Sequence, residues 1–267
     1  MARANRHFIP GYIWHITHRC HKREFLLKFS KDKKRWAYWL LEAKRRFKLV
    51  VLNYTVTSNH IHLLVYCNDS NVIPQAVQLI AGRTAQEFNN RRNRKGAFWQ
   101  DRYHATAFES RNHLMECIVY IDLNMVRAGV VNHPSEWKYG GYNEIQDPPL
   151  RYRIIHREML LRLLGHDNET QMKEAHRSWV DVLVEKRAYS RNPVWTESLA
   201  YGSKSYVAKI KDEMGYKAIG RSITENSSGF ELREIILPYN VSFDAPKGHL
   251  RPKNTFIYEE KDMNSVG

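Results

Sequence analysis

The chain has 267 residues, 43% of them hydrophobic, which is enough to build a core of its own. It carries 42 Lys and Arg against 28 Asp and Glu, a net charge of +14. Residues 1–150 hold 23 basic and 12 acidic residues, so most of the positive excess lies in this half. Such a field suits a phosphate backbone or an anionic membrane surface.

Composition argues against a membrane-spanning or secreted protein. No apolar run approaches the roughly 20 residues that a spanning helix needs, and no apolar segment follows the basic N-terminus as in a secretory signal. The three cysteines, Cys20, Cys67 and Cys117, form no Cys-X-X-Cys pair and are typical of reduced thiols. We therefore expect a cytoplasmic protein with no membrane partner.

Hydrophobic periodicity predicts alternating strands and helices in the first half of the chain. Ser30 is a candidate N-cap with Asp32 in the first turn after it, and Ser110 is a second candidate cap. Ser58-Asn59 is a turn signal between two strands, which indicates a hairpin. In chain order the expected elements are a strand at 12–20, a helix from 30, strands at 49–57 and 60–66, a helix at 72–92, a strand at 97–108 and a helix at 110–128.

This order, β-α-β-β-α-β with a trailing helix, predicts an α+β fold of the ferredoxin-like, split β-α-β kind. The expected sheet is antiparallel and four-stranded, with two helices on one face and the first and third strands as central neighbours. The later sequence is less regular, with helices expected at 156–165, 169–187 and 204–213. We predict a first domain over 1–148, a mostly helical C-terminal extension over 149–240 and a flexible tail over 241–267.

Two histidines in the third expected strand are the first candidates for a site. In a strand, residues i and i+2 point to the same face, so His60 and His62 stand side by side while Ile61 faces the core. Two imidazoles on one face make half of a metal site. The pair alone is also compatible with two solvated histidines.

The trailing helix supplies a matching polar face. Tyr120, Asn124 and Arg127 project together, because positions i, i+4 and i+7 share a helix face. The amide oxygen of Asn124 suits a hard cation such as Mg²⁺ or Mn²⁺, and Arg127 suits a phosphate. Tyr120 has a hydroxyl that we expect to ionise more easily beside a metal and cations, and so to attack phosphorus. Taken singly, Asn124 could be a capping residue and Tyr120 an ordinary helix residue.

These residues resemble the HUH single-tyrosine transposases, of the IS200-like type, and among them the REP-associated tyrosine transposases. The matching segments are residues 8–17, 58–65, 96–103 and 120–131, in the same order and spacing, and the resemblance extends over about residues 5–145. The sequence departs from the family twice. Thr57-Ser58 replaces the usual Met-Pro before the histidine motif, and Met125 replaces the usual Pro after Asn124.

The resemblance implies an enzyme that cuts and rejoins single-stranded DNA near palindromic, REP-like hairpins. His60, His62 and Asn124 would hold Mg²⁺ or Mn²⁺, and Tyr120 would be the nucleophile that forms a 5′-phosphotyrosine link. The family acts in the bacterial cytoplasm, associated with the nucleoid, as a monomer or a homodimer. Residues 150–267 lie outside the resemblance.

Basic and aromatic residues around these motifs are candidates for DNA contacts, since Arg and Lys bind phosphates and aromatic rings stack on bases. The candidates are Arg3, Arg6, Arg83, Arg91, Arg92, Arg94, Lys95, Arg102, Tyr103 and Arg127, with Trp99 as a further stacking residue. Three other hypotheses follow from the sequence. One is a catalytically silent regulator that binds DNA or RNA hairpins, and another is a zinc hydrolase with Glu87 or His104 as an added ligand. The third is an HUH replication initiator or relaxase, but the single Tyr120 on a short chain favours a transposase.

Overall fold

The computed structural model describes residues 8–109, 112–226 and 229–234. Its strands are β1 (Ile13–Arg19), β2 (Val50–Val56), β3 (His60–Tyr66), β4 (His104–Phe108), β5 (Ala200–Gly202), β6 (Arg221–Asn226) and β7 (Gly229–Glu234). Its α-helices are α1 (Ser30–Phe47), α2 (Val72–Arg92), α3 (Asn112–Asp122), α4 (Asn124–Arg127), α5 (Tyr142–Gln146), α6 (Arg157–Leu164), α7 (Glu169–Glu185), α8 (Val194–Glu197) and α9 (Lys204–Met214). No helix among these residues is long and apolar enough to cross a membrane. Arg3, Arg6, Ser110 and the expected tail over 241–267 lie outside the described residues.

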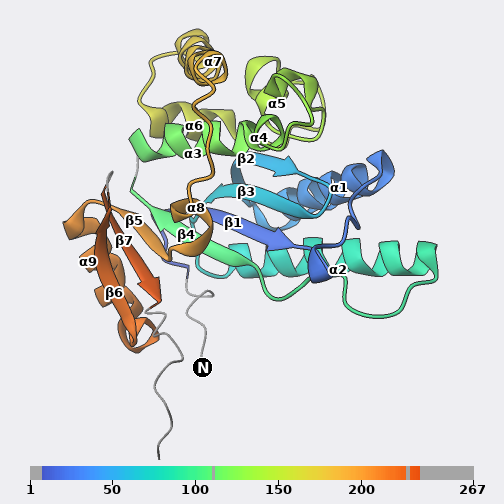
Figure 1. Ribbon diagram of the computed structural model, residues 1–267, viewed down its shortest axis with the longest axis horizontal. Helices are drawn as coiled ribbons and strands as arrows, with labels where there is room; N and C mark the ends of the chain where they lie inside the picture. The colour runs from blue at the N-terminus through green and yellow to red at the C-terminus, as the bar shows by residue number, and fades with distance from the viewer. Residues whose placement is uncertain (1–7, 110–111, 227–228, 235–267) are drawn as a thin grey trace, which may run out of the picture. The chain divides into compact units, whose positions relative to one another are not determined.

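The strands form one sheet in the order β2-β3-β1-β4-β5-β7-β6 (Figure 1). The first four strands pair antiparallel, with β1 and β3 as central neighbours, as the β-α-β-β-α-β order predicts. The expectation of a four-stranded sheet is wrong, because β5 pairs parallel with β4 and carries β7 and β6 beyond it. β5 has only three residues, too few for a period-two pattern to be recognised in the sequence.

The extension after residue 148 therefore has strands as well as helices. Its helices α6, α7 and α9 lie where periodicity predicts them. Its strand β5 joins the same sheet as the ferredoxin-like strands, so the fold continues across the expected boundary at residue 148. The division into domains itself stays a prediction.

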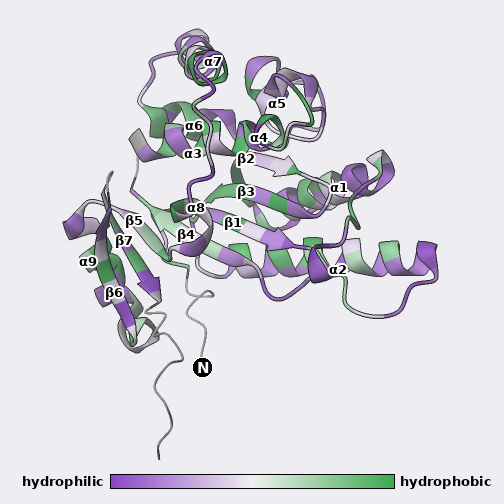
Figure 2. Cartoon of the chain, viewed as in Figure 1, coloured by the Kyte–Doolittle hydropathy of each residue, from purple (hydrophilic) through white to green (hydrophobic). Residues whose placement is uncertain are grey.

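The two faces of the sheet have different neighbours. α1 and α2 pack against each other on one face, and α3 and α6 lie on the other against β2 (Figure 1). Because side chains alternate along a strand, Ile61 and Leu63 point toward α1 and α2, and His60 and His62 point toward α3. Figure 2 shows apolar residues along β3 and β4 and alternating character along α2. The histidine motif thus faces the helix that carries Tyr120.

Three element boundaries differ from those predicted. Phe29, not Ser30, is the residue before α1, and it caps the helix with no side-chain hydrogen bond. The strand expected at 97–108 is shorter, since only an isolated bridge between Trp99 and Cys20 precedes β4. The helix expected at 110–128 is interrupted at Leu123, which divides it into α3 and α4. A break therefore occurs here although residue 125 is Met and not Pro.

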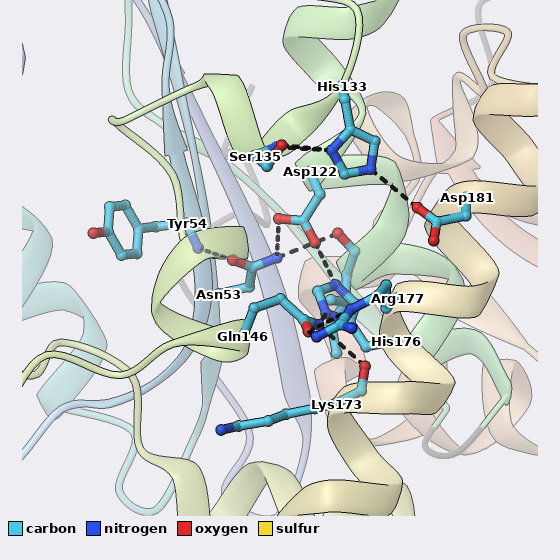
Figure 3. A network of polar contacts seen from close by, with 11 residues as sticks. Asn53, Tyr54, Asp122, His133, Ser135, Gln146, Lys173, His176, Arg177 and Asp181 are labelled. Atoms are coloured by element: carbon cyan, nitrogen blue, oxygen red, sulfur yellow. Dashed lines mark hydrogen bonds and ion pairs between the residues drawn. The ribbon is translucent and has the colours of Figure 1, made fainter.

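A buried polar network joins β2, α3 and α7 (Figure 3). Asn53 Nδ2 donates to Asp122 Oδ1 at 3.0 Å, and His176 Nε2 contacts Asp122 Oδ2 at 2.7 Å. All three residues are buried, so each polar atom needs its partner to offset the loss of water. The network fixes the C-terminal end of α3, two residues beyond Tyr120.

Candidate active site

The sequence-predicted residues His60, His62, Tyr120, Asn124 and Arg127 all line one cavity of about 580 Å³. His60 and His62 come from β3, Tyr120 from the last turns of α3, and Asn124 and Arg127 from α4. The break at Leu123 leaves this polar face intact. The structure therefore brings together residues that are about 60 positions apart in the chain.

Contacts of His60 Nδ1 with neighbouring oxygen atoms determine which ring nitrogen faces the cavity. Its Nδ1 lies 2.9 Å from Thr57 Oγ1 and 2.7 Å from Asn59 Oδ1. The Thr57 hydroxyl donates to the carbonyl oxygen of His60 at 2.8 Å, so its oxygen acts as an acceptor toward the ring. Nδ1 consequently donates, and Nε2 keeps its lone pair. Burial, followed by the positive charge of Arg19 and Arg127, lowers the pKa of His60 to about 4.

His62 has a partner on each ring nitrogen. Its Nδ1 lies 2.8 Å from Nε2 of His15 on β1, and its Nε2 lies 2.9 Å from Nδ2 of Asn124. Burial is the main reason that the pKa of His62 lies well below 6.5, so the ring is neutral at pH 7. A neutral imidazole is the form that binds metals.

These residues fit a divalent cation. The rings of His60 and His62 have centroids 5.0 Å apart on one face of the sheet, and Asn124 lies against Nε2 of His62. Rotating the side-chain amide of Asn124 by 180° exchanges its oxygen and nitrogen atoms. The oxygen then takes the position of Nδ2. The amide oxygen suits Mg²⁺ or Mn²⁺, whereas the two imidazole nitrogens also suit softer divalent metals, so the identity of the cation stays a prediction.

The zinc hypothesis gains no support. Within residues 8–109, 112–226 and 229–234, no group of three or more His, Cys, Asp or Glu side chains is arranged to hold a metal. Glu87 lies on α2, where Arg35 of α1 donates to it at 2.5 and 2.7 Å. His104 lines the cavity, but its Nε2 is bound to the carbonyl oxygen of Ser198 at 2.9 Å.

Tyr120 lies between the histidines and Arg127. Its ring centroid is 5.9 Å from that of His62, and the Arg127 guanidinium carbon lies 4.3 Å from the Tyr120 ring centroid. Burial raises the pKa of Tyr120 above its usual value of 10, while Arg127 and Arg191 act in the opposite direction. Burial therefore makes the hydroxyl harder to ionise than in water, and its easier ionisation beside a bound metal stays a prediction.

Five arginines give the cavity a positive lining: Arg19, Arg23, Arg102, Arg127 and Arg191. Asp101 and Glu197 are the acidic residues in its lining, and Glu197 accepts from Arg191 at 2.9 Å. Sequence reasoning identified Arg102 and Arg127 as DNA-binding candidates and missed the other three. Arg19 ends β1 directly opposite His60, so strand register was the one signal that could have found it.

The other DNA-binding candidates lie elsewhere. Arg83 and Arg92 are exposed on α2, packed over the rings of Trp39 and Phe29 at 5.4 and 5.0 Å, and Lys95 is exposed after that helix. Arg91 forms an ion pair with the buried Asp32 of α1, so it joins the two helices. Their DNA contacts stay predictions.

Three further candidates are already engaged within the protein. Arg94 donates to the carbonyl oxygen of Ala97 at 3.0 Å. Tyr103 is buried and stacks on Phe8 at 6.1 Å, and Trp99 stacks on His18 at 4.1 Å. Base stacking by either Tyr103 or Trp99 would require these contacts to open.

A comparison with known protein families finds a match in the first part of the chain. The family model described as "Transposase IS200 like" matches residues 9–124, a segment that includes His60, His62, Tyr120 and Asn124. No curated protein matches the chain.

Two solved structures are similar to parts of this chain. The chain is similar to a REP-associated tyrosine transposase bound to a REP hairpin, with 19% identity and a TM-score of 0.46 over 57% of this chain and 90% of that one. It also has 17% identity, with a TM-score of 0.33, to a Deinococcus radiodurans R1 protein described as a transposase, over 42% of this chain and 88% of that one. Residues 9–124, which are less than half of the chain, are therefore similar to the IS200-like transposases.

Proposed function

We propose that this protein is a metal-dependent endonuclease and strand transferase for single-stranded DNA with palindromic, REP-like hairpins. The observation that carries the proposal is the meeting of His60, His62, Asn124 and Tyr120 in one cavity lined by five arginines. A plain hairpin-binding protein needs the arginines, but it has no use for a buried tyrosine beside two neutral imidazoles on one face of the sheet.

In the proposed reaction, Tyr120 Oη attacks a backbone phosphorus atom. A bond forms between Oη and phosphorus while the bond from phosphorus to the 3′ oxygen breaks, and the 3′ oxygen takes up a proton to leave as a hydroxyl. The tyrosine proton passes to solvent. DNA is then linked through its 5′ phosphate to Tyr120, and a 3′-hydroxyl can later attack this link to rejoin strands without ATP.

The residues around Tyr120 have separate tasks. Arg127 lies against the tyrosine ring, where its positive charge favours the phenolate and a bound phosphate together. His60, His62 and Asn124 would hold Mg²⁺ or Mn²⁺, which polarises a phosphoryl oxygen and offsets charge that develops at phosphorus. Arg19, Arg23, Arg102 and Arg191 are suited to the phosphates on either side of the one that is cut.

Cleavage assays with end-labelled DNA test this proposal. Single-stranded palindromes labelled at the 5′ or the 3′ end are incubated with Mg²⁺ or Mn²⁺ and with wild type, Tyr120→Phe or the control Tyr38→Phe, which alters a half-exposed tyrosine on α1. We expect a covalent protein–DNA band carrying the 3′ label with wild type and the control, and none with Tyr120→Phe.

Two outcomes would contradict the proposal. A covalent band that survives in Tyr120→Phe would mean that another residue attacks. Tight, metal-independent hairpin binding with no cleavage by wild type would favour the silent regulator.

A further inference from the structure

His15 is a fully buried residue of β1 that the proposed reaction does not use. Its Nδ1 lies 2.7 Å from the carbonyl oxygen of Trp195 on α8, and its Nε2 lies 2.8 Å from Nδ1 of His62. The rings of His15 and His62 stack at 5.0 Å, with an interplanar angle of 11°. A continuous chain of hydrogen bonds thus runs from the C-terminal extension to a candidate metal ligand.

The chemistry of the groups determines which atom donates and which accepts in each of these hydrogen bonds. A backbone carbonyl only accepts, so Nδ1 of His15 must donate to Trp195. The neutral ring then has an acceptor at Nε2, which receives the Nδ1 proton of His62. A neutral His62 that is protonated at Nδ1 has its lone pair at Nε2, on the side of Asn124 and the cavity.

The opposite tautomer of His62 would be unsuitable for the site. A proton at Nε2 would occupy the position that a cation needs, and Nδ1 would face the lone pair of His15 Nε2 with no proton between them. The orientation of His62 therefore depends on His15, and the orientation of His15 depends on Trp195.

We propose that His15 is a positioning residue that fixes His62 in the Nδ1-protonated tautomer, and that the C-terminal extension controls the metal site through the Trp195 carbonyl. This rests on the proposed function only in that His62 is taken as a metal ligand. It also gives residues 194–197 a role, because α8 packs against β1 and β4 beside the catalytic cavity.

The tautomer is measured directly, without metal or DNA. Protein labelled with ¹⁵N-histidine is studied by long-range ¹H–¹⁵N NMR at pH 7, with His62 signals assigned through His62→Gln. We compare wild type, His15→Leu and His15→Gln. Gln keeps an oxygen to accept from His62 and an amide to donate to Trp195, whereas Leu offers neither.

We expect His62 to be protonated at Nδ1 in wild type and His15→Gln, and to redistribute between both nitrogens in His15→Leu. A His62 protonated at Nε2 in wild type, or one whose tautomer is the same in His15→Leu, would overturn the inference. Thermal melting confirms that each variant folds. If His15→Leu does not fold, the wild-type tautomer and its retention in His15→Gln decide the question.

Affinity for Mn²⁺, measured by the EPR signal of the free ion, separates this inference from the proposed function. We expect His15→Leu to weaken Mn²⁺ binding by about 10–100-fold and His15→Gln to stay close to wild type. Wild type that has the expected tautomer but binds no Mn²⁺ would refute metal dependence and leave the positioning role of His15 standing. Equal Mn²⁺ affinity in wild type and His15→Leu would refute control of the metal site by His15.

Discussion

At the scale of single residues, the site combines polar groups that the sequence shows with others that it hides. His60, His62, Tyr120 and Asn124 are recognisable because two short spacings, of two and four residues, place them on a strand face and a helix face. Thr57 and His15 cannot be recognised from the sequence, because their importance comes from hydrogen bonds to ring nitrogens. The His15–His62 contact joins β1 to β3, and only strand register reveals it.

Buried histidines make the free energy of unfolding depend on pH. Burial lowers the pKa of His15 and of His18 to about 3, from 6.5 in the unfolded chain. Between pH 3 and 6.5 the unfolded state binds more protons than the folded state. The free energy of unfolding therefore keeps its full value, as far as these histidines are concerned, above pH 6.5 and falls as the pH drops. We expect a lower melting temperature at pH 5 than at pH 7.

His18→Gln isolates one of these groups. Gln can still donate to the carbonyl oxygen of Asp101, which His18 Nε2 contacts at 2.8 Å, but it does not titrate. The free energy of unfolding should therefore fall less steeply between pH 7 and pH 5 in this variant, by up to about one bound proton. An identical slope in urea-unfolding series of wild type and variant would show that His18 is not held neutral.

Arg191 gives a second prediction at this scale. Its side chain reaches the cavity from the C-terminal extension. Arg191→Ala should weaken binding of single-stranded DNA and reduce the slope of log affinity against log salt by about one, because one phosphate contact is lost. Lys186→Ala, an exposed residue outside the cavity lining, is the control and should leave the slope unchanged. An Arg191→Ala slope equal to that of wild type would exclude a phosphate contact.

At the scale of elements, the sequence pattern is most informative where a segment is long and one-sided. Hairpin strand β3 and helix α2 have the boundaries that alternation and helical periodicity predict. The strand expected at 97–108 was overextended because Phe98 and Trp99 resemble strand residues, although they pack as an aromatic cluster with Phe88 and His18. The break between α3 and α4 has no signal at residue 125, where Met continues a helical pattern.

The attachment of α7 to α3 yields a prediction at the element scale. His176→Leu removes the partner of Asp122 Oδ2 and leaves a buried carboxylate incompletely paired. We expect a loss of about 3 kcal/mol in the free energy of unfolding, measured by urea denaturation. His133→Ala is the matched control, since it breaks a more exposed contact of α7 with Asp181 at 3.1 Å (Figure 3) and should cost less than about 1 kcal/mol. Equal costs for the two variants would contradict the importance of the buried network.

At the scale of the whole molecule, one sheet includes strands from the ferredoxin-like part and from the extension. The sequence predicted the four antiparallel strands and their central pair correctly, because local order specifies that topology. It did not predict that β5 adds parallel to β4, since a three-residue strand depends on its partner more than on its own pattern. The same pairing brings Trp195 and Arg191 to the site.

Truncation tests this continuity. A chain that ends at residue 148 loses β5 and also Trp195 and Tyr201, two buried aromatic residues that pack on each other at 5.4 Å. Removing one large buried aromatic side chain from a core costs about 3–5 kcal/mol, and β4 becomes an open sheet edge. We expect a destabilised, aggregating fragment in size-exclusion chromatography and thermal melting. A monomeric fragment as stable as the full chain would instead favour an independent domain over 1–148.

The central claim is that Tyr120 becomes covalently joined to DNA. Peptide mass spectrometry of the protein after reaction with a single-stranded palindrome and Mn²⁺, followed by nuclease digestion, tests it most directly. The account predicts a nucleotide 5′-phosphate on the peptide that contains Tyr120, and on no peptide of the Tyr120→Phe variant. A nucleotide found on another tyrosine of the wild-type protein would contradict it.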